Sequence, residues 1–312
     1  MHHPYDVLTP DSLAMLQVIS ETGSFAAAAR HLGLVPSALT YRVRQIEDAL
    51  DVLLFDRTAR QARPTEAGAE LLREGARLLR EIDAVANRVR RVATGWEPQL
   101  TIAVDGVVSP HTMLELVDAF YAMAPPTHLK LRDGILNGTL EALTSGHADL
   151  AIGVSVEGSN VAGLQQGLLG EMLFIYVVAP HHPLASVPEP LTDATLLQHR
   201  AVAVADSAQR GGATMGLLGG QDVLTLDTMQ AKVQAQLRGL GGGFLPEPMV
   251  RPYLEAGHLV ARRVARPERN MRMHYAWGGP GFTTAGRALH WWLNQLQSPA
   301  TRRALLENHH HF

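Results

Sequence analysis

A polar set of side chains follows Gly33 and shares one face of a helix that Pro36 is expected to open. The set combines two hydroxyls, an aromatic ring, a guanidinium and an amide: Ser37, Thr40, Tyr41, Arg44 and Gln45. Such groups are suited to hydrogen bonds with phosphate oxygens and with the edges of bases. The alternative is a solvated polar face on a packed three-helix unit. The residue types alone leave both interpretations open.

Three short helices are predicted to position this polar set. Thr9 and Pro10 are typical of an N-cap and a first helical residue, and the apolar residues that follow recur at helical spacing until Gly23. Ser24 is expected to cap a second helix, and a short glycine turn joins it to the helix that begins at Pro36. The inner face of that third helix carries residues spaced by four, three and four: Leu39, Val43, Ile46 and Leu50. Two helices joined in this way form a helix-turn-helix, whose second helix can enter the major groove.

Residues 23–72 resemble the N-terminal domain of LysR-type transcriptional regulators. The resemblance rests on two runs in the family's order, GSFAAAARHLGLVPSALTYRVRQIEDALDVLLFDR and RPTEAGAELL. It implies a winged helix-turn-helix domain over residues 8–65, with the motif itself at about 25–44 and wing strands at 53–57 and 62–64. Through this resemblance nine residues are expected to contact DNA, the last three through phosphates: Ser24, Pro36, Ser37, Thr40, Tyr41, Arg44, Arg57, Arg60 and Arg63.

The start of the expected recognition helix departs from the family pattern. The family usually has a hydroxyl residue followed by Gln, whereas this chain has Val35 and Pro36. Pro36 suits the first helical position, but Val35 cannot cap the helix, and an amide able to read a base is missing. The base preference at this position is therefore not fixed by the resemblance. Tyr41 either supplies a stacking or methyl contact instead or is an exposed spacer.

A long helix is predicted for residues 66–95, where a Gly-Trp-Glu-Pro run ends it. Apolar residues recur every seven positions, and a second seam lies between them: Leu71, Leu78, Val85 and Val92, with Gly75, Ile82 and Val89. This heptad pattern is typical of a two-helix coiled seam. The alternative is a helix packed on its own domain. Dimerisation is favoured because a helix between two domains has few intramolecular faces to cover the stripe, and the resemblance implies the linker helix of a dimer.

After Pro98 the pattern changes to strands that alternate with helices. Strands are predicted at 100–104, 129–132, 148–153, 174–179, 201–205 and 243–245, and a closing helix at 285–296. The alternation predicts an α/β domain over residues 98–300 with a parallel sheet. Crossing strands near 163–179 and 271–278 would join two lobes and leave a cleft. The runs LTSGHADLAIG, VVAPHHPLA, LRGLGGGFLP and LEAGHLV resemble the LysR-type effector domain, which implies its two-lobed, periplasmic-binding-protein-like fold.

Ligands of doubly wound sheets bind beyond the carboxyl ends of strands, at helix N-termini. Applied to both lobes, this rule predicts an effector site formed by eight residues: Asp105, Val107, Ser109, Leu136, Asn137, Asp206, Ser207 and Thr228. Ser109 and Thr228 are also natural N-caps. Ser109 offers hydroxyl and N–H donors to an acceptor group, whereas the two aspartates argue against a simple anion as the ligand.

Composition excludes several classes of protein. The chain has 312 residues, enough for two domains, and a net charge of -3, but residues 30–63 hold six arginines against four acids. It contains no cysteine, which excludes a disulfide scaffold and a Cys-ligated zinc site. Neither a secretory signal nor a run of the ~20 apolar residues of a spanning helix is visible. We therefore expect a cytoplasmic protein without a membrane partner.

The sequence supports a catalytic function less well than it supports DNA binding. The glycine-rich run 238–243 follows a helix and precedes a strand, the reverse of a phosphate loop. The pair His181-His182 points apart on an extended chain, which disfavours a metal site. We expect no catalytic residue, no metal and no cofactor.

The predicted function is sequence-specific regulation of transcription, controlled by a small-molecule effector bound between two lobes. The expected partners are double-stranded DNA with an interrupted inverted repeat, RNA polymerase, and further copies of the chain in a homodimer or homotetramer. One alternative is a two-lobed solute-binding or transferase-type enzyme, which leaves the first 95 residues without a purpose. The other is a winged-helix scaffold for protein partners, which predicts no salt-dependent affinity for DNA.

Overall fold

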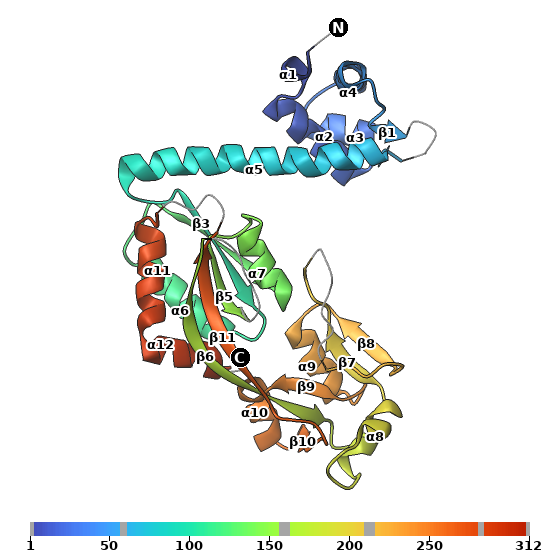
Figure 1. The fold of residues 1–312 in the computed structure, drawn as a ribbon, viewed down its shortest axis with the longest axis vertical. Coiled ribbons are helices and arrows are strands. Elements are labelled where there is room, and N and C mark those ends of the chain that lie inside the picture. The colour runs from blue at the N-terminus through green and yellow to red at the C-terminus, as the bar shows by residue number, and fades with distance from the viewer. Residues whose placement is uncertain (1–2, 57–60, 156–162, 209–215, 280–283, 310–312) are drawn as a thin grey trace. The chain divides into compact units, whose positions relative to one another are not determined.

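The computed structural model describes residues 3–56, 61–155, 163–208, 216–279 and 284–309. The chain forms two compact units, Met1–Val89 and Arg90–Phe312. The first unit is mainly helical, and the second is built around a β-sheet with helices on both faces (Figure 1).

The first unit begins with four short helices, and their predicted caps are confirmed. The helices are α1 (Pro4–Val7), α2 (Pro10–Thr22), α3 (Phe25–His31) and α4 (Pro36–Leu50). Thr9 Oγ1 accepts a hydrogen bond from Ser12 N at 3.2 Å, and Ser24 Oγ accepts one from Ala27 N at 3.4 Å. Val35 precedes α4 without a side-chain cap, as expected. Helix α1 was not predicted.

The apolar faces of these helices form one core. Leu39, Val43 and Ile46 of α4 are at most 2% exposed, and they belong to the same cluster as the buried side chains of α2. Ala28 and Ala29 of α3 are completely buried in this cluster. Because the α3 side chains are so small, the neighbouring helices can approach closely, and the outer face of α4 is left to solvent.

The wing is attached to α4 by a buried carboxylate. Strands β1 (Phe55–Asp56) and β2 (Arg63–Pro64) pair antiparallel and are shorter than predicted. Glu47 of α4 is 4% exposed, and its Oε1 accepts a hydrogen bond from Leu54 N at 2.9 Å. Thr65 Oγ1 donates to Leu53 O at 2.6 Å and begins helix α5 (Glu66–Thr94). A side chain on Gly68 would overlap with Leu54 O, so the close approach of α5 to the wing requires glycine.

The heptad stripe of α5 is covered only at its start. Gly75 is buried against Leu13, and Leu71 packs against the core of the first unit. Further along the helix, the seam residues are between 45% and 86% exposed: Leu78, Ile82, Val85, Val89 and Val92. The single chain therefore leaves most of the stripe in contact with solvent.

The second unit is organised by a seven-stranded mixed sheet. Its strands are β3 (Gln99–Asp105), β4 (His128–Gly134), β5 (Leu150–Val154), β6 (Leu164–Val178), β9 (Gly243–Pro246), β10 (Val260–Arg262) and β11 (Arg269–Gly278). Strands β4, β3 and β5 are parallel, as predicted. The expectation of a wholly parallel sheet is wrong, because β11 returns from late in the chain and pairs antiparallel with both β5 and β6.

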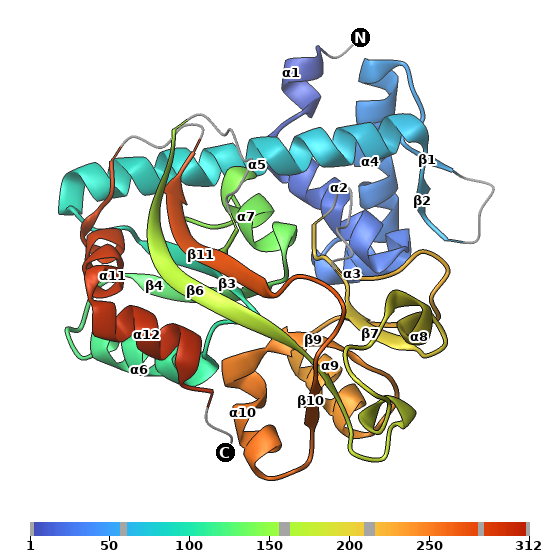
Figure 2. The same ribbon diagram turned by 60° about the horizontal axis from the view of Figure 1, so that its bottom comes forward.

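Two lobes share the crossing strands β6 and β11 (Figure 2). The first lobe adds to β3, β4 and β5 the helices α6 (Pro110–Tyr121), α7 (Asn137–Thr144), α11 (Arg287–Gln297) and α12 (Pro299–Glu307). The second adds to β9 and β10 the elements η1 (Pro183–Ala185), α8 (Asp193–Leu197), β7 (Ala201–Val204), β8 (Val223–Leu226), α9 (Met229–Leu237) and α10 (Glu247–Glu255). Helix α12 was not predicted and extends the folded chain beyond residue 300.

The bond from Leu54 to Glu47 gives a test of how the wing is held. Replacing Glu47 with Met keeps a similar side-chain length but removes the acceptor, so the buried Leu54 N–H loses this bond. We expect the free energy of unfolding to fall by about 1–3 kcal/mol, measured by urea denaturation. Glu47→Gln keeps an acceptor oxygen and is the matched control. Equal stability of the Met and Gln variants would show that this bond does not hold the wing.

Candidate functional site

The outer face of α4 presents the predicted polar set to solvent. Ser37, Tyr41 and Arg44 are exposed. Thr40 Oγ1 donates to Pro36 O at 2.9 Å, so its hydroxyl offers only lone pairs to a further partner. Gln45 Nε2 donates to the Tyr41 hydroxyl at 3.2 Å, which links the aromatic ring to the next turn of the helix. Pro36 is exposed beside Val35, so the first turn of α4 is apolar.

A hollow of about 380 Å³ lies where α3, α4 and the wing meet. Three of the predicted residues line it together: Ser24, Thr40 and Arg44. Asp56 and Gln61 of the wing complete its rim. The structure therefore brings residues from the cap of α3 and from two turns of α4 to one concave surface.

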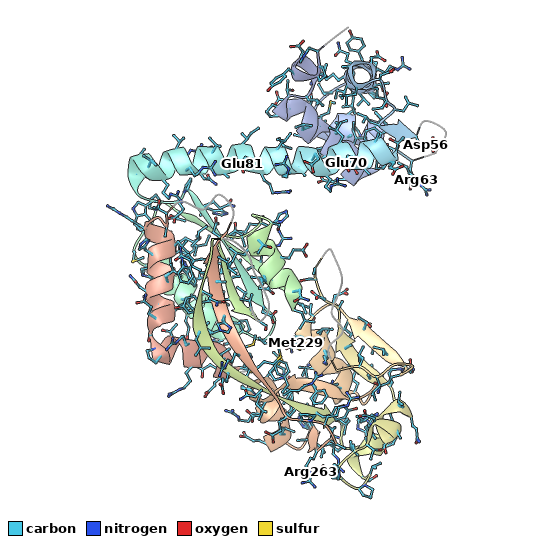
Figure 3. The ribbon with its side chains drawn as sticks, in the orientation of Figure 1. Asp56, Arg63, Glu70, Glu81, Met229 and Arg263 are labelled. Carbon is cyan, nitrogen blue, oxygen red and sulfur yellow. The ribbon has the colours of Figure 1, made fainter. Side chains whose placement is uncertain are left out.

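The wing carries the remaining predicted DNA contacts. Arg63 is exposed on β2, opposite Asp56 in the register of the pair (Figure 3). Arg57 and Arg60 lie outside the described residues.

In the second unit, Asp105 is buried at the end of β3. Its Oδ1 accepts a hydrogen bond from Val107 N at 3.1 Å, and its Oδ2 accepts from Leu136 N at 2.9 Å and from Thr139 Oγ1 at 3.0 Å. Burial raises the pKa of Asp105 to about 7, and the charge of Asp206 acts in the same direction. The hydrogen bonds to its carboxylate oppose this shift. Asp105 thus fastens the turn that precedes α7.

Three of the predicted effector residues bond across the contact between the two lobes: Asn137, Asp206 and Ser207. Asp206 of the second lobe accepts hydrogen bonds from Asn137 Nδ2 at 2.9 Å and from Gly138 N at 3.1 Å. The Ser207 hydroxyl accepts from Ile135 N at 2.9 Å, and the intervening Leu136 adopts a positive φ of 54°. A side chain on Gly138 would overlap with Ser207 Oγ, so this approach requires glycine. The convergence of strand ends from both lobes is therefore observed.

Ser109 does not offer its donors to a ligand in this structure, contrary to expectation. Its N–H donates to Leu305 O at 2.8 Å, and its hydroxyl donates to Asn308 O at 2.7 Å. The side chain is completely buried. Both donors are used by the end of α12, the helix that the sequence did not reveal.

The last two predicted effector residues differ in exposure. Val107 is 4% exposed and belongs to the apolar core that both lobes share. Thr228 is exposed and caps α9, since its hydroxyl accepts a hydrogen bond from Ala231 N at 3.1 Å.

Sequence reasoning missed two further residues, one that holds Asp105 and one at the contact between the lobes. Thr139 holds Asp105, and Met229 lies on the first turn of α9 (Figure 3). A Cβ on Gly106 of the first lobe would lie 3.3 Å from Met229 Cβ. Met229 follows the predicted cap Thr228 directly, so its place at a helix start was the signal that could have found it.

Within the described ranges, no helix is long and apolar enough to cross a membrane. Among the same residues, no group of three or more His, Asp or Glu side chains is placed to hold a metal ion.

Comparisons with known proteins agree with this architecture. Residues 10–69 match the family described as bacterial regulatory helix-turn-helix protein, lysR family, and residues 93–298 match the LysR substrate binding domain. The chain is 38% identical over 262 residues to the probable HTH-type transcriptional regulator YhaJ of Escherichia coli (strain K12), covering 84% of this chain and 87% of YhaJ. It is 34% identical over 287 residues to the HTH-type regulator YeeY of the same organism, covering 92% of each.

A solved structure shares the fold. Full-length CbnR in complex with its target DNA superposes with a TM-score of 0.59 at 16% identity, covering 93% of this chain and 99% of CbnR. The predicted fold class, a helix-turn-helix domain followed by a two-lobed α/β domain, is confirmed.

The buried Asp105 gives a pH-dependent prediction. Its pKa is about 7 in the folded chain and 3.8 in an ordinary exposed aspartate. Between these pH values the folded state holds a proton that the unfolded state has lost, so stability falls as the pH rises and levels off above about pH 7. The carboxyl accounts for a loss on the order of 4 kcal/mol across this window.

Asp105→Asn removes the titrating group and should flatten the pH dependence of the melting temperature, followed by circular dichroism. Asp133→Asn replaces an exposed carboxylate on β4 and is the control. If Asp105→Asn melts with the wild-type slope between about pH 5 and pH 7, the buried carboxyl is not the titrating group.

Proposed function

The chain belongs to the LysR family of bacterial regulatory helix-turn-helix proteins, and from this premise we propose which of its residues read DNA and which respond to an effector. It is a transcriptional regulator with an effector-binding domain. The observation that carries the proposal is the exposed polar face of α4, set beside the wing on an intact helical core.

The outer face of α4 lies in the major groove of double-stranded DNA. Ser37, Thr40 and Arg44 contact base edges, while Tyr41 is held by Gln45 for a stacking or methyl contact. The exposed Val35 and Pro36 present apolar surface, which suits thymine methyl groups rather than amide-reading of adenine. Arg63, with Arg57 and Arg60 of the wing, contacts phosphates, and the cap of α3 at Ser24 adjoins the backbone.

The exposed stripe of α5 pairs two chains. Its seam residues have the heptad spacing of a coiled coil and lie open to solvent in the single chain. A homodimer, or a tetramer formed from two dimers, places two recognition helices on an interrupted inverted repeat. The protein acts in the cytoplasm, where the chromosome and RNA polymerase are accessible to it.

The effector acts at the contact between the lobes. Asn137 and Gly138 of the first lobe bond to Asp206 of the second, and Ile135 of the first lobe bonds to Ser207. Leu136 and Thr228 complete the proposed site. A ligand that binds there competes for these hydrogen bonds and shifts the lobes toward a second arrangement. It can do so only by its difference in affinity for the two arrangements. The resulting change in the spacing of the recognition helices alters DNA bending and contact with RNA polymerase.

Variants of two arginines distinguish contacts to bases from contacts to phosphates. Their binding is measured in a gel-shift assay on the DNA upstream of the protein's own gene. Arg44→Ala should lower the preference for this fragment over random duplex, by about 1–3 kcal/mol per base pair read. Arg63→Ala should weaken binding to both duplexes alike and reduce the salt dependence by about one unit of slope.

Arg303→Ala on α12 replaces an exposed arginine outside the first unit and should bind like the wild type. Loss of binding by Arg44→Ala that is equal on both duplexes would contradict direct base reading. A wild-type protein without any preference for the upstream fragment would contradict the proposed function itself.

A charged residue introduced into the seam of α5 tests whether this seam joins two chains. Val85→Asp should place a carboxylate in the seam of each helix and convert the dimer to monomers, which sedimentation velocity measures. Ala86→Asp adds the same charge one residue along, off the seam, and is the control. A Val85→Asp protein that still sediments as a dimer would show that another surface joins the subunits.

A further inference from the structure

Lysine is rare in this chain, and one of its two lysines is buried. The sequence holds Lys130 and Lys232 beside twenty-five arginines. Lys130 is exposed on β4, whereas Lys232 on α9 is only 7% exposed. An ammonium is more strongly hydrated than a guanidinium, so lysine is the less favourable cation to bury. Its use at a buried position of an arginine-rich chain therefore needs a reason.

The ammonium of Lys232 lies among neutral and positive groups. Its Nζ donates to Phe244 O on β9 at 2.7 Å, the one hydrogen bond that it makes to the described part of the chain. The Arg269 guanidinium stacks on the Phe244 ring, 4.4 Å from the centroid. Burial, and secondly the charge of Arg269, lower the pKa of Lys232 to about 8. No described carboxylate pairs with Lys232, although a buried charge is stable only when it is paired.

Gln236, one turn further along α9, is also unsatisfied. It is completely buried, and neither its Nε2 nor its Oε1 has a hydrogen-bond partner among the described residues. A Cβ on Gly243 would lie 2.8 Å from Gln236 Nε2 and 3.5 Å from Lys232 Cε, so both side chains lie against the same residue of β9. An ammonium with unused protons and an amide with unused donors form a pair of sites complementary to a carboxylate.

This pair lies just behind the contact between the lobes. Lys232 N donates to Thr228 O at 3.1 Å, which places Lys232 in the first turn after the cap of α9. In the same turn, Met229 faces Gly106 of the first lobe. Met229 also shares one apolar core with Val107 and Ile135 of that lobe. Separation of the lobes would therefore expose the first turn of α9 and open a path to Lys232.

We propose that Lys232 and Gln236 form the anion-binding part of the effector site, and that the effector is a small organic carboxylate. The inference rests on the proposed function, because it assigns a ligand class to the same interlobe site. The carboxylate accepts hydrogen bonds from Lys232 Nζ and Gln236 Nε2, and Arg269 adds a second positive charge.

Because the chain has only two lysines, NMR can follow the protonation of Lys232 directly. The full chain labelled with ¹³Cε-lysine gives one signal from Lys130 and one from Lys232, and Lys130→Arg assigns them. The Lys232 signal is titrated with pH in the presence of millimolar sodium benzoate or sodium succinate, with sodium chloride at the same ionic strength as the reference. Benzamide is the neutral counterpart of benzoate, and inorganic phosphate tests the other common oxyanion.

We expect at least one of the two carboxylates to raise the titration midpoint of Lys232 by about one pH unit or more, and benzamide to leave it unchanged. Lys130 should not respond. A shift with phosphate but with neither carboxylate would overturn the carboxylate class. No shift beyond the chloride reference with any of the anions would overturn the site.

Gln236→Leu removes the amide while keeping an apolar side chain of similar size. The melting temperature of the ligand-free protein should stay unchanged or rise, because no hydrogen bond is lost. The affinity for the carboxylate that shifts the Lys232 signal should fall about tenfold. Gln234→Leu, at an exposed position of the same helix, should bind it like the wild type. A Gln236→Leu protein that melts lower, or that binds the carboxylate unchanged, would remove Gln236 from the site.

The gel shift on the upstream DNA fragment, made with the same labelled sample, keeps the two proposals apart. Selective DNA binding without a Lys232 shift would refute the carboxylate site alone. Loss of DNA selectivity would refute the proposed function whatever Lys232 does.

Discussion

Carboxylates that accept hydrogen bonds from backbone N–H groups hold the main junctions of this chain. Glu47 joins α4 to the wing, Asp105 joins the end of β3 to the turn before α7, and Asp206 joins one lobe to the other. A buried N–H without a partner is costly, so each of these acceptors stabilises the junction that it joins. Each junction is therefore fixed in direction as well as in place. The attachment of the wing to α4 and the contact between the lobes depend on these bonds.

The sequence predicted those features whose contacts are local in the chain. The first unit is governed by local signals: Thr9, Ser24 and Pro36 start helices at the predicted positions because a cap is satisfied within three residues. The heptad stripe of α5 was equally visible. The sequence could not show that Leu71 and Gly75 pack on their own unit while Val85 stays exposed, because that depends on which neighbour covers each turn.

The errors in the second unit come from contacts between distant parts of the chain. Strand β11 pairs with β5 and β6 from far along the sequence and makes the sheet mixed, which an alternating pattern of strands and helices does not reveal. Ser109 was assigned to a ligand from its place after a strand, yet its donors bond to Leu305 and Asn308. Lys232 and Gln236 were overlooked for the same reason. Their surroundings come from β9, which sequence periodicity cannot place beside them.

The junction after α5 suggests how the lobes are linked to the end of that helix. Glu97 is buried, and its two carboxylate oxygens accept hydrogen bonds from Gly286 N at 2.7 Å and Ala288 N at 3.0 Å, at the start of α11. Arg287 N donates to Gly95 O at 2.9 Å between them. The residues that directly follow α5 are thus fixed to a helix of the first lobe. The second lobe is joined to the first by the bonds of Asp206 and Ser207, by the crossing strands and by a shared apolar core. Under the proposed function, a ligand that replaces these hydrogen bonds shifts the second lobe relative to the end of α5. Coupling between two sites requires such an element with two arrangements that both sites can bias. In the proposed function the interlobe contact is that element, since its hydrogen bonds to Asp206 and Ser207 lie beside an apolar core that both lobes share.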